Sequence, residues 1–501
     1  MILKRCEIIV ANTALFMVML FAAPATASGP LTDFSSERFT TATVCAHCHN
    51  DLTDRTGADV SIVNDWSTSM MAFSFIDPFW QAQVASEIAR APTLKEVITE
   101  KCSRCHAPMA HTQTASDGHG NGKPDYDFVP LDNASHGAAG EGVGCTLCHQ
   151  IADSPILGTA PFFSGRYAPV LSSGQIYGQY SGVLTRPMLR MTGFQPIYGK
   201  QIHQSRICGT CHNVKTPYLD RAGRLASTPS TEFPEQAVYT EWEQSAYGEK
   251  GLTPVTCQEC HMPSAGGVIL ASRPPWLETA REQFSRHTFF GANTMIRDLI
   301  LRNGLAEGTP PDTLKKNLTG VRRFLSSSAT VALVDSSLKG GILTARLSVQ
   351  NRTGHKLPTG FPSRRLFIHY VVSDEQGRIV FESGKSGDGS LRVMGVDADG
   401  DGRTFEPHHD VITTPEQVQV YEGIMGNTEG EVTYVVVGLP GKRYTVSAEL
   451  IYQTISYRFL ENLYEERREP AVAAFDSSLT YAPLRQEIIT RVERIITADS
   501  R

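Results

Sequence analysis

Five short stretches of one pattern decide how this 501-residue chain must fold: Cys45-Ala-His-Cys48-His49, Cys102-Ser-Arg-Cys105-His106, Cys145-Thr-Leu-Cys148-His149, Cys208-Gly-Thr-Cys211-His212 and Cys257-Gln-Glu-Cys260-His261. In each stretch two cysteines stand three residues apart, and a histidine follows the second at once. A chain with 11 Cys and 15 His would contain roughly 0.007 such stretches by chance. The repetition therefore has a chemical cause.

Covalent haem attachment explains every residue of the repeated stretch. Two thiols at this spacing can each form a thioether to one vinyl group of the same haem, and the adjacent histidine becomes an axial ligand of the iron. Zinc sites made of four cysteines would use the pairs two at a time, which five pairs do not allow, and they need no histidine. Disulfides within the pairs would leave five histidines unexplained. We therefore predict five covalently bound haem c groups.

The second axial ligand of each haem is expected among the remaining histidines. His111, His136 and His203 lie close in sequence to a motif, and the chain around His136 and His203 is expected to pass near a neighbouring haem. Two further candidates are His287, just before a predicted helix, and His355, at the end of a predicted strand. Methionine sulfur is the competing ligand, and it would raise the reduction potential relative to histidine. The methionine candidates are Met70, Met71, Met109 and Met262.

The segment that carries the motifs is expected to be a pentahaem domain over residues 40–305. So few residues separate the motifs that the haems must form much of the interior, which predicts a loop-rich, mostly helical domain. Helical periodicity is clear over residues 78–91 and 294–303. Residues 306–327 are predicted to form a linker or helix.

The C-terminal half has no cysteine, and its pattern changes to that of strands. Leu343, Ala345 and Leu347 alternate with polar residues, and the stretches 366–372, 378–381, 432–437 and 444–452 continue this period of two. We predict an antiparallel β-sandwich over residues 328–460 and a helical tail over 461–501, with its helix between Pro483 and Ile496. The predicted fold class is α+β.

Two loops in this half are candidate ligand sites. The loop from Asn351 to Arg365 has two glycines and two prolines around His355, so we expect His355 to reach a haem of the first domain and Arg364 or Arg365 to pair with haem propionates. The acidic stretch from Asp397 to Gly402 has the alternate carboxylates of a calcium loop, but its twelfth position is His408 instead of glutamate. Two interpretations of this loop therefore stay open, a calcium-binding loop and a solvated turn.

Composition and the N-terminus indicate an exported protein. Residues 1–27 are predicted to be a signal peptide, because Lys4 and Arg5 precede an apolar run that ends in Ala25-Thr-Ala27. A net charge of −6 without a basic run argues against nucleic-acid binding. We expect a location in the periplasm or outside the cell, redox proteins as partners, and membrane contact only through a partner. Assembly into a homo-oligomer stays open.

The chain resembles the exported multihaem c-type cytochromes of the cytochrome c-554/c-prime group. The resemblance covers roughly residues 40–300 through the five motifs, and it extends to three segments that begin at Trp66, Trp242 and Cys260: Trp66-Ser-Thr-Ser-Met-Met-Ala72 with Asp77-Pro78, Trp242-Glu-Gln-Ser-Ala-Tyr247 and Cys260-His-Met-Pro263. The stretch Gly354-His-Lys-Leu-Pro-Thr-Gly360 looks like a segment that recurs in β-domains appended to such cytochromes.

Two functions are weighed on these grounds. The first is electron transfer through five haems that each have two protein ligands, with no catalytic residue. The alternative is a multihaem oxidoreductase in which one haem keeps an open site, where it reduces or oxidises a small nitrogen or sulfur compound. Whether the protein is an enzyme is therefore left open.

Overall fold

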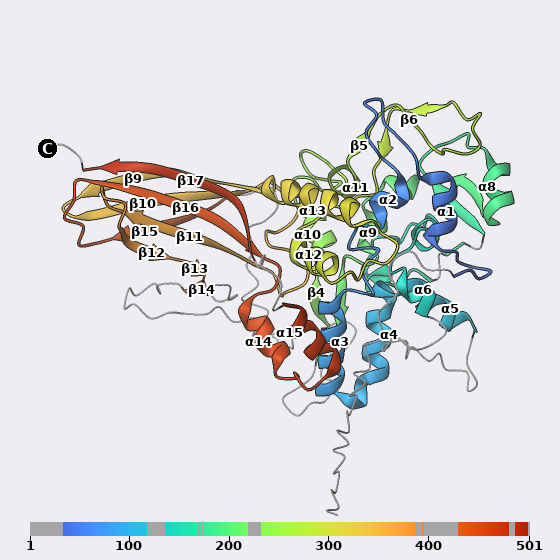
Figure 1. Cartoon of the computed structure of the whole chain (residues 1–501), viewed down its shortest axis with the longest axis horizontal. Helices are drawn as coiled ribbons and strands as arrows, with labels where there is room; N and C mark the ends of the chain where they lie inside the picture. The colour runs from blue at the N-terminus through green and yellow to red at the C-terminus, as the bar shows by residue number, and fades with distance from the viewer. Residues whose placement is uncertain are drawn as a thin grey trace, which may run out of the picture.

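The chain folds into a helix-rich part followed by a strand-rich part, and its fold class is α+β (Figure 1). The computed structural model describes residues 34–117, 136–168, 171–172, 174–218, 232–386, 393–394, 429–479 and 486–498. The predicted signal peptide and the acidic loop from Asp397 to His408 lie outside the described residues. In the part that is described, no helix combines the length and apolarity needed to cross a bilayer.

Short helices carry the five motifs: α1 (Ala42–His49), α4 (Lys95–His106), α7 (Cys145–Cys148), α9 (Arg206–Gly209) and α11 (Cys257–His261). The other α-helices of this part are α2 (Ile62–Trp66), α3 (Pro78–Arg90), α5 (Pro108–Asp117), α6 (His136–Gly140), α8 (Thr185–Thr192), α10 (Val238–Glu243), α12 (Thr294–Arg302) and α13 (Pro311–Ser326). Short 3-10 turns are η1 (Pro92–Leu94), η2 (Ala160–Phe162) and η4 (Lys200–His203). Both helices predicted from periodicity are confirmed as α3 and α12.

Local sequence explains where α3 begins. The Asp77 carboxylate accepts hydrogen bonds from the backbone N–H groups of Phe79 and Trp80, and Pro78 occupies the first helical position, where no N–H is needed. Two-stranded pairs connect the other helices of this part: β1 (Gln175–Gly178) with β2 (Gln195–Tyr198), β3 (Val214–Thr216) with β4 (Phe233–Gln236), β5 (Ser264–Ala265) with β8 (Phe284–Ser285), and β6 (Val268–Ile269) with β7 (Ala280–Arg281).

The strand-rich part contains two antiparallel sheets. The first has the order β15 (Glu429–Val436), β10 (Ile342–Asn351), β9 (Ala329–Lys339); the second has the order β12 (Ile379–Ser383), β11 (Arg365–Ser373), β16 (Arg443–Gln453), β17 (Glu487–Thr497). A separate small pair joins β13 (Lys385–Ser386) and β14 (Val393–Met394). Leu343 and Leu347 of the first sheet are buried in one cluster with Tyr370 and Val446 of the second. The strands predicted from alternation are confirmed as β10, β11, β12, β15 and β16.

The predicted helix between Pro483 and Ile496 is wrong, because residues 487–497 form β17. This strand pairs antiparallel with β16, so that Arg443 lies opposite Thr497. β-branched residues dominate the segment, which favours a strand, and the free edge of β16 offers the pairing partner. The helices of the C-terminal tail lie earlier, as α14 (Tyr457–Tyr464) and α15 (Pro470–Leu479).

An aromatic cluster joins this tail to the first part of the chain. The Phe79 ring of α3 lies 5.6 Å from that of Phe459 in α14, 5.5 Å from that of Phe475 in α15, and 6.2 Å from that of Phe361 (centroid distances). Figure 1 shows α14 and α15 against α3, below the strands. The two parts of the chain therefore share a packed core at α3.

Phe475→Ala should lower the free energy of unfolding by about 3–5 kcal/mol, because it removes a fully buried ring from this cluster. Urea unfolding followed by far-UV circular dichroism measures the loss. Leu252→Ala is the control, since Leu252 is 95% exposed and its removal should change the stability by less than about 0.5 kcal/mol. Equal effects of the two substitutions would show that the cluster does not join the two parts.

Candidate functional site

The five motifs surround one large cavity of about 1170 Å³. This volume exceeds that of an ordinary small-molecule pocket, and most of the lining side chains are apolar. Nine motif cysteines and all five motif histidines line it: Cys45, Cys102, Cys105, Cys145, Cys148, Cys208, Cys211, Cys257, Cys260, His49, His106, His149, His212 and His261. A large apolar space with thiols and imidazoles in its wall fits several covalently bound haems.

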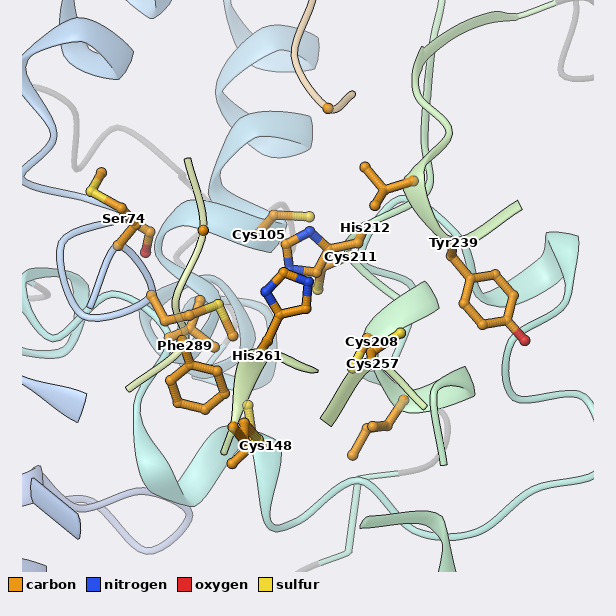
Figure 2. A pocket seen from close by; sticks show the side chains of 18 of the residues that line it. Ser74, Cys105, Cys148, Cys208, Cys211, His212, Tyr239, Cys257, His261 and Phe289 are labelled. Atoms are coloured by element: carbon orange, nitrogen blue, oxygen red, sulfur yellow. The ribbon is translucent and has the colours of Figure 1, made fainter. Parts of the chain in front are cut away.

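Thiols of different motifs touch one another in this cavity. The Cys45 thiol is hydrogen-bonded to that of Cys145, which joins the first motif to the third. In the same way Cys105 meets Cys211, and Cys208 meets Cys257. Figure 2 shows the last two pairs around the His212 and His261 rings. Groups attached at the second, fourth and fifth motifs would therefore be neighbours, although they are far apart in sequence.

Four of the five motif histidines are held in one tautomer. Nδ1 of His49 lies 3.0 Å from the Leu270 carbonyl oxygen, that of His106 lies 2.7 Å from the Ser74 carbonyl oxygen, and that of His149 lies 2.6 Å from the Tyr177 carbonyl oxygen. His261 has the same bond with the Phe290 carbonyl. Because a carbonyl only accepts, Nδ1 carries the proton and Nε2 keeps its lone pair for a metal.

Burial keeps these imidazoles neutral. It lowers the pKa of His106 and of His212 to about 4, and it lowers the pKa of His49, His149 and His261 as well. A neutral imidazole is the form that binds a metal ion, so each ring is ready to act as a ligand without losing a proton.

Two of the predicted distal histidines stand opposite motif histidines. The ring centroids of His149 and His287 are 6.2 Å apart with planes at 22°, and those of His261 and His355 are 6.3 Å apart with planes at 17°. Two metal–nitrogen bonds of about 2.0 Å, with about 1.1 Å from each nitrogen to its ring centre, add up to about 6 Å. Both pairs therefore have the separation of two imidazoles that bind one metal from opposite sides.

His287 and His355 have the same tautomer as the four motif histidines whose Nδ1 is bound to a carbonyl. Nδ1 of His287 lies 3.1 Å from the Ser285 carbonyl oxygen, and Nδ1 of His355 lies 3.0 Å from that of Lys356. Burial lowers the pKa of His287 to about 3 and that of His355 to about 4.

The loop between β10 and β11 places His355 in the cavity wall by contacts with α10. The Glu241 carboxylate accepts hydrogen bonds from the Lys356 N–H (3.1 Å) and the Thr359 hydroxyl (2.5 Å), while burial raises the Glu241 pKa. The Asn351 amide donates to the His355 carbonyl at 2.7 Å. A Cβ at Gly354 would lie only 3.1 Å from the Trp242 ring, so glycine permits this close approach.

Other predicted ligands have different surroundings. His203 lines the cavity but is exposed, and its Nε2 lies 3.3 Å from the Gln179 carbonyl oxygen. His111 is not among the lining residues, and its Nε2 lies 3.6 Å from a Glu100 carboxylate oxygen. The His136 backbone begins α6, and its side chain lies outside the described part.

The methionine candidates are divided between the cavity and the core. Met70, Met71 and Met262 line the cavity. Met109 is fully buried, accepts a hydrogen bond from the Thr146 hydroxyl at 3.5 Å and is not among the lining residues.

The two arginines predicted to pair with haem propionates, Arg364 and Arg365, differ in their position relative to the cavity. Arg364 lines the cavity, and its Nη1 donates to the Thr359 carbonyl at 2.8 Å. Arg365 is not among the lining residues; its guanidinium lies 5.6 Å from the centre of the Phe367 ring.

Sequence analysis missed two residues beside the histidines. Glu241 fixes the His355 loop, and the Trp80 ring lies parallel to that of His106 at 4.5 Å. Both act across the fold, so no spacing rule links them to the histidines they support. Glu241 directly precedes Trp242 of the segment that carries the resemblance, which was the one available signal.

Comparison with solved structures finds one protein of similar fold. No protein-family model matches the chain, and no curated protein matches it either. Among solved structures, the chain is similar to a penta-heme cytochrome c552 from Thermochromatium tepidum, with a TM-score of 0.51 and 17% sequence identity. The alignment covers 92% of this chain and 99% of that chain. At this identity the comparison shows that the two proteins share a fold.

Proposed function

We propose that this protein is a multihaem c-type cytochrome that carries electrons through five covalently bound haems, in the periplasm or outside the cell. The observation that carries the proposal is one cavity lined by all five motif histidines, with two further imidazoles facing two of them. The shared fold with a penta-heme cytochrome c552 supports it. We assign residues 40–305 to the cytochrome c-554/c-prime group and regard the two sheets as a β-sandwich.

The chain's own residues would hold and order the cofactors. Each cysteine pair would fix one haem by two thioethers, and each motif histidine would bind the iron through Nε2. Bound haem supplies one-electron redox chemistry. Contacts between thiols of different motifs would place the first haem beside the third, and the fourth beside the second and the fifth, and electron transfer requires such neighbouring haems.

His287 and His355 are proposed as the second ligands at the third and fifth motifs. Their ring separations from His149 and His261 support this assignment. Two strong nitrogen donors leave no coordination position for a substrate at those two irons, so these haems would serve electron transfer. The strand-rich part would then complete a redox centre of the helix-rich part.

The proposed partners are redox proteins that meet the molecule after export. The net charge of −6, together with haem propionates, favours basic surfaces on those partners. A calcium ion in the acidic loop from Asp397 and assembly into a homo-oligomer stay predictions.

A catalytic oxidoreductase is the second candidate, and one observation favours it. In the described part of the chain, His49, His106 and His212 face no second imidazole at the separation seen for His149 and His261. A haem with an open sixth position could bind a small nitrogen or sulfur oxyanion. Carbon monoxide binding to the reduced protein distinguishes the two candidates, since it requires an open iron.

Purified protein should contain five iron atoms per chain, all in covalently attached haem, and no stoichiometric zinc. Cys148→Ala should lower the covalent haem count to four, or leave one haem attached by a single thioether, because Cys148 supplies one of the two bonds at its motif. Mass spectrometry and metal analysis measure both quantities. Two or more zinc ions per chain in the wild type would contradict haem attachment.

His355→Ala should convert one iron in five from low spin to high spin. The potential of that haem should rise, since the lost nitrogen donor stabilises the ferric state. Paramagnetic resonance of the oxidised protein and a redox titration measure these changes, and added imidazole should restore the low-spin signal. His369→Ala is the control in the same part of the chain, because His369 pairs with Glu382 instead of lining the cavity. An unchanged spin state in His355→Ala would show that His355 is not a ligand.

Glu241→Ala should give a mixture of spin states at the same haem. The substitution removes the acceptor of both the Lys356 N–H and the Thr359 hydroxyl, so the loop would hold His355 less firmly. Glu241→Gln keeps one acceptor oxygen and should have the smaller effect. A fully low-spin spectrum in Glu241→Ala, at an unchanged haem count, would contradict this positioning role.

A further inference from the structure

Arg297 is a buried cation with an unsatisfied hydrogen-bond donor. It lies in α12, its exposed fraction is 1%, and it lines the cavity. Nε donates to the Thr68 carbonyl and Nη2 to the Phe289 carbonyl, both at 3.3 Å. Nη1 is buried and has no hydrogen-bond partner among the residues that the structure describes. The edge of the guanidinium formed by Nε and Nη2 is thus bound to two neutral oxygens, while Nη1 is free to donate to a ligand.

No carboxylate of the described residues compensates this charge. Other arginines of the same region have acidic partners: Arg286 binds Asp65 at 2.6 Å, and Arg302 binds Asp298 at 2.6 Å. Burial lowers the pKa of Arg297 to about 9, and no acidic group offsets that effect. A buried charge without a counter-charge is costly in free energy. A ligand that brings an anion to the Arg297 side chain would remove this cost.

We propose that Arg297 binds a propionate of one of the haems, and this inference rests on the proposed function. A propionate is the carboxylate that a haem brings into a cavity lined by haem-attachment motifs, and a guanidinium is the matching donor. A free oxyanion is the other source of the same chemistry. Burial of Arg297 favours an anion that arrives with the cofactor and stays.

Neighbouring residues narrow the choice of haem. Phe289, whose carbonyl holds Arg297, lies two residues after His287, and the next carbonyl, that of Phe290, accepts from His261 Nδ1. The haem that Arg297 serves is therefore the one at the third or the fifth motif.

The experiment is a redox titration of the holoprotein with Arg297→Met, Arg297→Lys and Arg302→Met. In Arg297→Met one of the five midpoint potentials should fall, because an uncompensated propionate stabilises the ferric state; the other four should stay. Arg297→Lys keeps a positive charge and should give a smaller fall. Arg302→Met is the matched control on the same helix and should change none, since the Arg302 side chain is 43% exposed and does not line the cavity.

Three results would overturn the inference. The first is an unchanged set of potentials in Arg297→Met with five haems attached. The second is saturable binding of nitrite or sulfite to the wild type that Arg297→Met abolishes, which would assign the position to a free anion. The third is a crystal structure of the wild type in which every haem propionate lies away from Arg297. If Arg297→Met does not accumulate, this crystal structure and the titration of Arg297→Lys test the inference instead. A wild type without covalent haem would instead contradict the proposed function.

Discussion

The hydrogen bond between histidine Nδ1 and a backbone carbonyl is the interaction on which the candidate site depends. Four motif histidines make it, and their acceptors lie far away in the chain: Leu270 for His49, Ser74 for His106, Tyr177 for His149 and Phe290 for His261. Each bond fixes a ring, selects its tautomer and ties a short motif helix to another segment. The helices α7 and α11 have only four and five residues, and helices this short could not orient the His149 and His261 rings alone.

The strand-rich part has its own buried core, and it also contributes a loop to the cavity wall. Its two sheets bury one cluster of side chains away from the cavity, while the loop after β10 extends to α10 and brings His355 opposite His261. A second connection at Phe79 holds the C-terminal helices on α3. Two contacts of different chemistry, one polar and one aromatic, thus fix the position of the loop relative to the motifs.

Buried polar groups around the cavity differ in how they are satisfied. Glu241 receives two hydrogen bonds from the loop that it holds, so its burial serves a contact between the two parts of the chain. Arg297 donates hydrogen bonds to two backbone carbonyls, and its Nη1 has no partner among the described residues. The first group finds its partners within the protein, and for the second we propose an anion as the missing partner.

The sequence by itself predicted haem attachment at five motifs, and it predicted two of the helices and five of the strands that the structure contains. Thioether formation and ligation by the motif histidine need residues at fixed neighbouring positions, so spacing alone predicts them, and alternation predicts the strands β10, β11, β12, β15 and β16. The tertiary structure decided which histidines face each other, that residues 487–497 pair with β16 as a strand, and that Arg297 meets no carboxylate of the described segments. These properties depend on distances between segments far apart in the chain, and a local pattern carries no information about such distances.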